Sequence, residues 1–187
     1  MVDLGGWSTG AVEYDSQVVK TVGLISLAFL ALWMFRSKRP SANFSLEELT
    51  TTNTGLSNVP SSSARANLDK LANEVLEPLR ERFGPIIISI GYRSPATTAA
   101  VGGVSDSAHL SGSAIDAFAE DGTSAATMAA WLYDSSLPLN QVLIYWNKGH
   151  LHIARDTGGT PYRRDFKETF DGGKTWNAWK PGGRRIT

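Results

Sequence analysis

Hydrophobic residues recur at helical spacing over residues 68–83. The apolar positions, three and four residues apart, are Leu68, Leu71, Ala72, Val75, Leu76, Leu79 and Phe83. This spacing predicts a helix with one buried face, which serines 61–63 can cap and which Gly84-Pro85 ends. Pro78 lies inside the pattern and predicts a kink or the start of the last turn, because proline has no backbone N–H to donate.

Short apolar runs after this helix predict strands. The runs cover residues 86–90, 114–118, 141–146 and 150–154. Asn147-Lys148-Gly149 separates the last two runs and predicts a hairpin turn between them. A second helix is expected over 123–134, with short helical pieces over 46–49 and 97–101. This mixed order predicts an α+β fold, with a small antiparallel sheet flanked by helices.

The longest apolar run lies near the start of the sequence. Residues 21–35 carry no charge, and with residues 18–20 the run approaches the roughly 20 residues that cross a bilayer. Trp33 suits the headgroup region, and the basic residues 36, 38 and 39 end the run. These features predict a single-pass transmembrane helix over 18–36, and so a membrane location. A cleaved signal peptide and a buried core helix are the alternatives.

Composition suggests how the rest of the chain is divided. We expect a short polar segment over 1–17, a linker over 37–42, one folded domain over 43–160 and a carboxy-terminal extension over 161–187. Within the extension, residues 169–176 read Thr-Phe-Asp-Gly-Gly-Lys-Thr-Trp and resemble the Asp-box hairpin, a structural motif. Contact with carbohydrate through Trp176 and Trp179 is the alternative.

Charge and cysteine content exclude several classes of function. The chain has 18 basic and 18 acidic residues, so no nucleic-acid partner held by bulk charge is expected. It contains no cysteine, which excludes disulfides, thiolate metal sites and a cysteine nucleophile. It contains three histidines, and all of them lie in two short segments, 107–116 and 149–152.

These two segments together can form one metal site. Side chains alternate along a strand, so His150 and His152 point to the same side. If the hairpin pairs beside the strand over 114–118, His109, Asp116 and His152 can converge on one divalent ion. Three protein ligands and a position left for water are typical of a catalytic zinc. Structural histidines, or a zinc ion held only for folding, are the alternatives.

The residues around this site also match a known signature, S-x-H-x-x-G-x-A-x-D. Its fixed positions are filled by Ser107, His109, Gly112, Ala114 and Asp116. The chain here resembles the zinc D-alanyl-D-alanine carboxypeptidase family, which includes phage L-alanyl-D-glutamate endolysins and shares its fold with hedgehog signalling domains. Residues 91–95, Gly-Tyr-Arg-Ser-Pro, and the segments 43–49 and 67–84 are similar to the family as well. The resemblance covers roughly residues 43–155 and implies a zinc peptidase domain.

The resemblance also implies roles for individual residues. His109, Asp116 and His152 are the implied ligands of Zn²⁺, and Arg93 is implied to stabilise the oxyanion of the reaction. A surface ion pair is the other interpretation of Arg93. Many members carry a general base three residues before the last ligand, where this chain has Gly149. His150 is therefore our candidate for the base or for a stabiliser of the transition state.

Three carboxylates close in sequence to the ligands could replace His150 in that role. They are Asp106, Glu120 and Asp121. If none of these groups reaches the site, the domain would bind zinc without catalysing a reaction.

The combined prediction is a membrane-anchored zinc metallopeptidase that hydrolyses an amide next to a D-amino acid in peptidoglycan stem peptides. It would act as a D,D-carboxypeptidase or an L-alanyl-D-glutamate endopeptidase. The family also favours a phage lytic enzyme associated with the virion, with virion proteins as partners and a virion or bacterial inner membrane as the location. The alternative is a non-catalytic zinc-binding virion protein of the same fold, structural or binding the cell wall.

Overall fold

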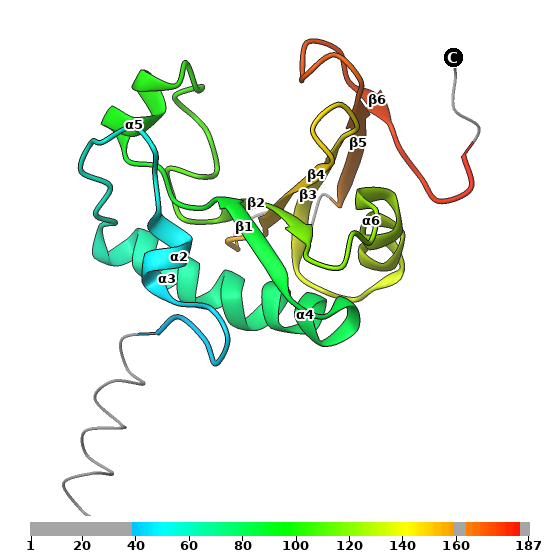
Figure 1. Cartoon of the computed structure of the whole chain (residues 1–187), viewed down its shortest axis with the longest axis horizontal. Coiled ribbons are helices and arrows are strands. Elements are labelled where there is room, and N and C mark those ends of the chain that lie inside the picture. Colours follow the sequence, from blue (N-terminus) through cyan, green and yellow to red (C-terminus); the bar gives the residue numbers. More distant parts are fainter. Residues whose placement is uncertain (1–38, 159–163, 184–187) are drawn as a thin grey trace, which may run out of the picture. The chain divides into compact units, whose positions relative to one another are not determined.

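The computed structural model describes residues 39–158 and 164–183, and within them the strands form one six-stranded sheet (Figure 1). Along the sheet the order is β1-β2-β4-β3-β5-β6. The strands are β1 Ile86–Ile90, β2 Ala114–Ala119, β3 Leu139–Tyr145, β4 His150–Arg155, β5 Asp165–Thr169 and β6 Asn177–Ala178. The predicted hairpin is present as β3 and β4, with Tyr145 opposite His150.

The sheet is mixed, whereas the sequence predicted an antiparallel one. β5 runs parallel to β3, with Gln141 beside Asp165 and Tyr145 beside Thr169. The other neighbouring strands are antiparallel. β5 begins at the end of the sheet where β4 finishes, and β3 begins at that same end. A strand that starts there beside β3 has to run in the direction of β3.

The predicted long helix is present as three consecutive pieces over residues 62–83. These are α3 Ser62–Leu71, the π-helical η1 Ala72–Leu76 and α4 Glu77–Phe83. The Ser61 hydroxyl caps the start by accepting a hydrogen bond from the Ala64 N–H, and Gly84, at φ 76°, ends the helix. Pro78 cannot donate to the preceding turn, and the wider π turn before it lets the helix continue.

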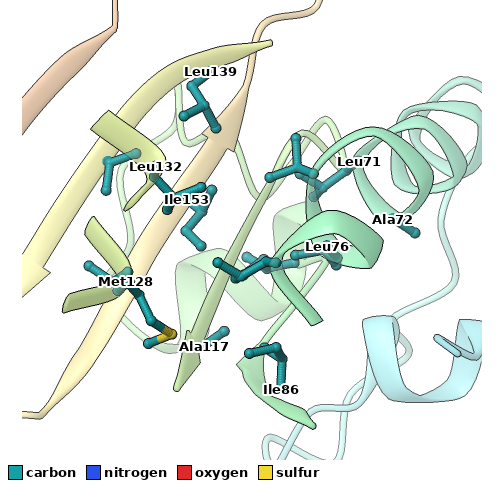
Figure 2. Packing of buried hydrophobic residues seen from close by; sticks show 14 of the residues in the cluster. Leu71, Ala72, Leu76, Ile86, Ala117, Met128, Leu132, Leu139 and Ile153 are labelled. Carbon is teal, nitrogen blue, oxygen red and sulfur yellow. The ribbon is translucent and has the colours of Figure 1, made fainter. Parts of the chain in front are cut away.

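One face of the sheet packs against this helix and against α6, Ala125–Asp134. Strand residues that alternate toward the helices are buried, among them Ile115, Ile144 and Ile153. Figure 2 shows Leu76 and Ile153 in the same core as Met128 of α6. Full burial of such a side chain contributes roughly 1.5–3 kcal/mol relative to an exposed one. The core therefore determines which face of each strand is left for the site.

The predicted location at a membrane is contradicted by the helices that the structure describes. Within residues 39–158 and 164–183, none of them is long and apolar enough to cross a bilayer. The helical stretch over 62–83 carries Arg65, Asp69 and Lys70 on its more exposed positions, because only its other face is buried. The apolar run over 18–36 lies outside the described residues. The location at an inner or virion membrane is therefore withdrawn.

The carboxy-terminal segment adds a hairpin to the sheet. β5 and β6 pair with Lys167 opposite Ala178, and the loop between them carries the motif that resembles an Asp-box. The Asp171 carboxylate accepts hydrogen bonds from the backbone N–H groups of Lys174 and Thr175, both at 3.0 Å. It also accepts from the hydroxyls of Thr175 and Thr169, at 2.7 and 2.9 Å. The motif thus lies in a loop that Asp171 closes with hydrogen bonds between β5 and β6.

Candidate metal centre

Two of the predicted ligands come from neighbouring strands. Asp116 of β2 lies directly opposite His152 of β4, as the metal-site hypothesis required. Both side chains point away from the core, since their neighbours Ile115 and Ile153 point into it. Asp116 Oδ1 lies 2.9 Å from His152 Nδ1. Pairing of these two strands therefore brings together residues that are 36 positions apart.

The third ligand, His109, comes from the loop before β2. Gly112, at φ 69°, turns this loop back toward the sheet, and it lies so close to the Ala64 carbonyl of α3 that a Cβ would overlap it. The Arg93 N–H donates to the His109 carbonyl at 3.2 Å and holds the other side of the loop. As a result, His109 Nε2 lies 3.2 Å from His152 Nδ1 and 3.4 Å from Asp116 Oδ1.

The second nitrogen of His109 is fixed by a backbone carbonyl. Its Nδ1 lies 2.8 Å from the Gly91 oxygen and must carry the proton there, because a carbonyl only accepts. Nε2 is therefore the ring nitrogen that faces Asp116 and His152. Gly91 itself lies against the end of α2, Leu46–Thr50, where a Cβ would overlap the Leu49 carbonyl. Such an outer hydrogen bond is a regular feature of metal-binding histidines.

The three donor atoms fit a divalent metal ion. They lie within 4.8 Å of one another and comprise two imidazole nitrogens and one carboxylate oxygen. The residues are nearly covered, with exposed fractions of 2% for His109, 7% for Asp116 and 9% for His152. A buried carboxylate between two imidazoles is costly unless it is paired, and this donor set suits zinc.

Electrostatics keeps Asp116 and His152 in the protonation states that ligation needs. Burial acts to raise the pKa of Asp116, but hydrogen bonding to His109 and His152 outweighs it, and the pKa lies well below the usual carboxyl range. Burial lowers the pKa of His152 despite the opposing effect of Asp116. At neutral pH the carboxylate is therefore ionised and the imidazole of His152 is neutral.

An open cleft of about 550 Å³ leads to this group. The three predicted ligands lie at the cleft together with Arg93 and His150. The cleft is lined by Ile90, Arg93, Val104, Asp106, Ser107, Ala108, His109, Asp116, Asn140, Gln141, Leu143, Tyr145, Lys148, His150, His152, Ala154 and Asp165. The structure therefore brings all five predicted site residues to one cavity.

Arg93 lies in this cleft with unused donor capacity. Its Nη2 lies 3.4 Å from the Ser107 hydroxyl, and its Nε is buried without a hydrogen-bond partner. The predicted alternative, an ion pair, is not observed with any acidic side chain in the described part of the chain. An uncompensated guanidinium is suited to an anion or to an oxygen that gains negative charge.

His150 lies on the same strand face as His152, and only 12% of its side chain is exposed. Its Nε2 lies 3.9 Å from Asp116 Oδ2, and its ring centroid lies 4.8 Å from that of Tyr145. Burial lowers the pKa of His150, although Asp116 acts against this shift. A neutral imidazole next to the candidate metal ligands is able to accept a proton.

Of the three carboxylates that could replace His150 as the base, only one lies at the cleft. Asp106 lines the cleft, whereas Glu120 and Asp121 lie beyond the far end of β2 and do not. The Asp121 carboxylate instead accepts from the Thr123 N–H at 2.8 Å, in the loop before α6.

Two further residues at the cleft, Tyr145 and Lys148, were not predicted from the sequence. The hairpin pairing offered a signal for Tyr145, since it is the residue opposite His150.

Comparison with known proteins identifies the family of the chain. The family model for peptidase M15 matches residues 42–154, which include all five predicted site residues. A search of curated protein sequences gave no significant match. The members of the matched family are zinc-dependent, in agreement with the donor set of His109, Asp116 and His152. The chain therefore belongs to the M15 family of zinc metallopeptidases.

Proposed function

We propose that this protein hydrolyses an amide bond next to a D-amino acid in the stem peptides of peptidoglycan. The observation that carries the proposal is the group of His109, Asp116 and His152 at an open cleft that Arg93, with a buried Nε that has no hydrogen-bond partner, and His150 also line. Family membership supports a peptidase acting on peptidoglycan. The association with a virion stays a prediction from the resemblance.

The metal would be held by the Nε2 of His109, the Oδ1 of Asp116 and the Nδ1 of His152. A bound zinc ion supplies Lewis-acid activation of a water molecule and of the scissile carbonyl. The carboxylate offsets part of the positive charge. The carbonyl of Gly91 orients the imidazole of His109 through its Nδ1–H.

Arg93 is the proposed stabiliser of the developing negative charge. Amide hydrolysis converts a neutral carbonyl oxygen into an oxyanion, so a fixed cation is more useful in the transition state than before it. The Arg93 backbone is held by its bond to the His109 carbonyl, and the side chain has a donor left over. Removal of one such donor typically costs roughly 10²–10³-fold in turnover.

His150 is the proposed proton carrier. The imidazole would accept a proton from the attacking water at one nitrogen and later deliver it to the leaving amine. Its neutral state at pH 7 follows from the burial that lowers its pKa. Gly149 occupies the position at which many relatives carry a carboxylate, so the role falls to the neighbouring imidazole.

Two types of cleavage are compatible with this chemistry. A D,D-carboxypeptidase would release a terminal D-alanine, and an L-alanyl-D-glutamate endopeptidase would expose a new amino group on D-glutamate. Both reactions place a carbonyl and a chiral centre in the cleft. The released products identify the type directly.

The test uses the full chain, loaded with zinc and incubated with purified peptidoglycan. We expect new amino termini or free D-alanine, loss of the product with a chelator, and recovery when zinc is restored. The His152→Ala variant is the matched control. A folded, zinc-loaded protein that releases no product would overturn the proposal and favour the non-catalytic zinc-binding alternative.

A further inference from the structure

The carboxy-terminal hairpin lies beyond the residues matched by the family model, yet it reaches the cleft. The match ends at residue 154, and β5 begins at Asp165. Parallel pairing in register puts Thr169 of β5 beside Tyr145 of β3. The loop that follows then brings Trp176 onto Tyr145, with ring centroids 5.3 Å apart and planes at 87°.

Tyr145 contacts both this hairpin and the candidate catalytic residue His150. Its other ring contact is His150, at 4.8 Å and an angle of 42°. The Lys148 ammonium lies 5.2 Å from the centroid of the Tyr145 ring. Gly173 lies close enough that an added Cβ would be 3.6 Å from the ring. The ring is thus held by contacts from β4, from the β3–β4 turn and from the carboxy-terminal loop.

The loop that carries Trp176 is itself well defined. The Asp171 carboxylate accepts from two backbone N–H groups and two hydroxyls within the loop. Gly173, at φ 99°, donates its N–H to the Thr169 hydroxyl at 2.9 Å. An edge-to-face aromatic pair is favourable beyond the burial of the two rings, so the contact with Trp176 favours one orientation of the Tyr145 ring.

Tyr145 also lines the cleft, and it lies opposite His150 in the paired strands β3 and β4. Burial and the carboxylate of Asp116 raise the pKa of Tyr145, against the opposing charge of Arg93. The phenol therefore stays protonated at neutral pH and can donate a hydrogen bond. The natural acceptors in a stem peptide are its carbonyl and carboxylate oxygens.

We propose that Tyr145 donates a hydrogen bond to an oxygen of the bound peptide, and that Trp176 is a positioning residue that holds the Tyr145 ring against His150. This inference rests on the proposed peptidase function. It makes the carboxy-terminal hairpin a part of the substrate cleft of this chain.

Kinetics of three variants test the two roles. Tyr145→Phe keeps the ring and removes the donor, so kcat/KM should fall roughly 3–10-fold, the worth of one hydrogen bond. Trp176→Ala frees the ring and should lower kcat/KM by a similar, roughly 3–10-fold factor, while Trp176→Phe should restore most of it. Bound zinc should not change in any of them.

Trp179→Ala is the matched control. Trp179 lies near the same hairpin, but it packs on Phe166 and Tyr133, at 6.2 and 6.4 Å, and does not line the cleft. Its loss should lower the melting temperature without changing KM or kcat at a temperature where the variant is folded.

A second readout needs no activity. In the zinc-free protein, the ring signals of His150 in ¹H–¹³C NMR spectra should shift with Trp176→Ala and not with Trp179→Ala. Unshifted signals with wild-type kinetics in Trp176→Ala would overturn the positioning role, and wild-type kinetics in Tyr145→Phe would overturn the hydrogen bond. If the wild-type protein releases no product, the proposed function fails, and the NMR signals alone decide whether Trp176 holds the Tyr145 ring against His150.

Discussion

The metal centre and the carboxy-terminal hairpin differ in how far apart in the sequence their hydrogen-bonded residues lie. At the metal centre, His109 contacts Gly91 and His152 across 18 and 43 residues, and His152 contacts Asp116 across 36. In the hairpin, Asp171 contacts residues two to four positions away. The first site exists only when distant strands pair, whereas the second needs little beyond its own loop.

The two regions also differ in how far their residues are buried. The metal centre is enclosed, and Asp171 is exposed. A change at the centre leaves charged or polar groups away from water, which is costly, while a change at the hairpin lets water replace the lost partners. We therefore expect substitutions at the metal centre to reduce zinc binding and activity. Substitutions at the Asp171 turn should change only the stability of the hairpin. Four changes, from the largest expected effect to the smallest, test this difference.

Removing a ligand should have the largest effect. In His152→Ala, the remaining His109 and Asp116 hold zinc poorly, and product release should fall below detection. Loss of a mere outer partner of a metal ligand costs roughly 10–100-fold in metal affinity, so the loss of a ligand should exceed that range. Zinc content per chain and peptidoglycan cleavage measure the two effects. Full zinc occupancy in this variant would show that the centre lies elsewhere.

His150→Ala should separate chemistry from metal binding. Loss of a general base or acid typically costs roughly 10²–10⁴-fold in turnover. Zinc content should stay near that of the wild type, because His150 is not among the three grouped donors. Steady-state kinetics and metal analysis of the same sample give the answer. An equal loss of zinc and turnover would instead make His150 a ligand.

Gly91→Ala tests how far the centre depends on the fold around it. The added methyl would overlap the Leu49 carbonyl, so the backbone must shift, at a cost of about 1–3 kcal/mol in the free energy of unfolding. The shift should also weaken the support of His109 and reduce zinc affinity by roughly 10–100-fold. Denaturation with and without zinc separates the two effects.

The control for Gly91→Ala is Gly122→Ala. Nothing lies within 4 Å of a Cβ at Gly122, although its φ of 80° makes alanine strained there. This variant should lose stability and keep its zinc affinity. A loss of zinc affinity in both variants would mean that general destabilisation, and not the contact to His109, is responsible.

Asp171→Ala should have the smallest effect, a modest drop in melting temperature with zinc content unchanged. Hydrogen bonds from the backbone and hydroxyl of Thr175 hold the pKa of Asp171 below its ordinary value. A lowered folded-state pKa means that the stabilisation is complete above the unfolded value of about 3.9 and is lost as pH falls below it. The difference in melting temperature between the zinc-free wild type and variant should therefore shrink at low pH. A loss of zinc in this variant would contradict the local character of the turn.

Much of the fold was predictable because its signals are local. The buried face of the helix over 62–83, the hairpin of β3 and β4 and the strand alternation of His150 and His152 all follow from spacing and turn residues. The candidate ligand set was predicted for a different reason. His109 and Asp116 lie in a signature of the family to which the chain belongs, and His152 lies in the later segment 149–152, still inside the matched residues.

Other features could not be predicted because they depend on residues that are distant in the sequence. The antiparallel prediction failed at β5, because the direction of a strand depends on the end of the sheet at which the chain re-enters. The membrane prediction was drawn from an apolar run and its flanking residues, and the helices that the structure describes elsewhere in the chain are amphipathic or short. The support of His109 by the Gly91 carbonyl could not be foreseen from a single glycine.

By itself, the sequence determined which chemical groups the site would contain and which of them share a strand face, because periodicity and turn preference act over a few residues. Only the tertiary structure decided how these groups meet. Pairing of β2 with β4 set Asp116 against His152, packing of Gly112 on α3 turned His109 toward them, and pairing of β5 with β3 brought Trp176 to Tyr145. The reason is physical: burial of the common core selects the strand partners, and the site occupies the face that this core leaves open.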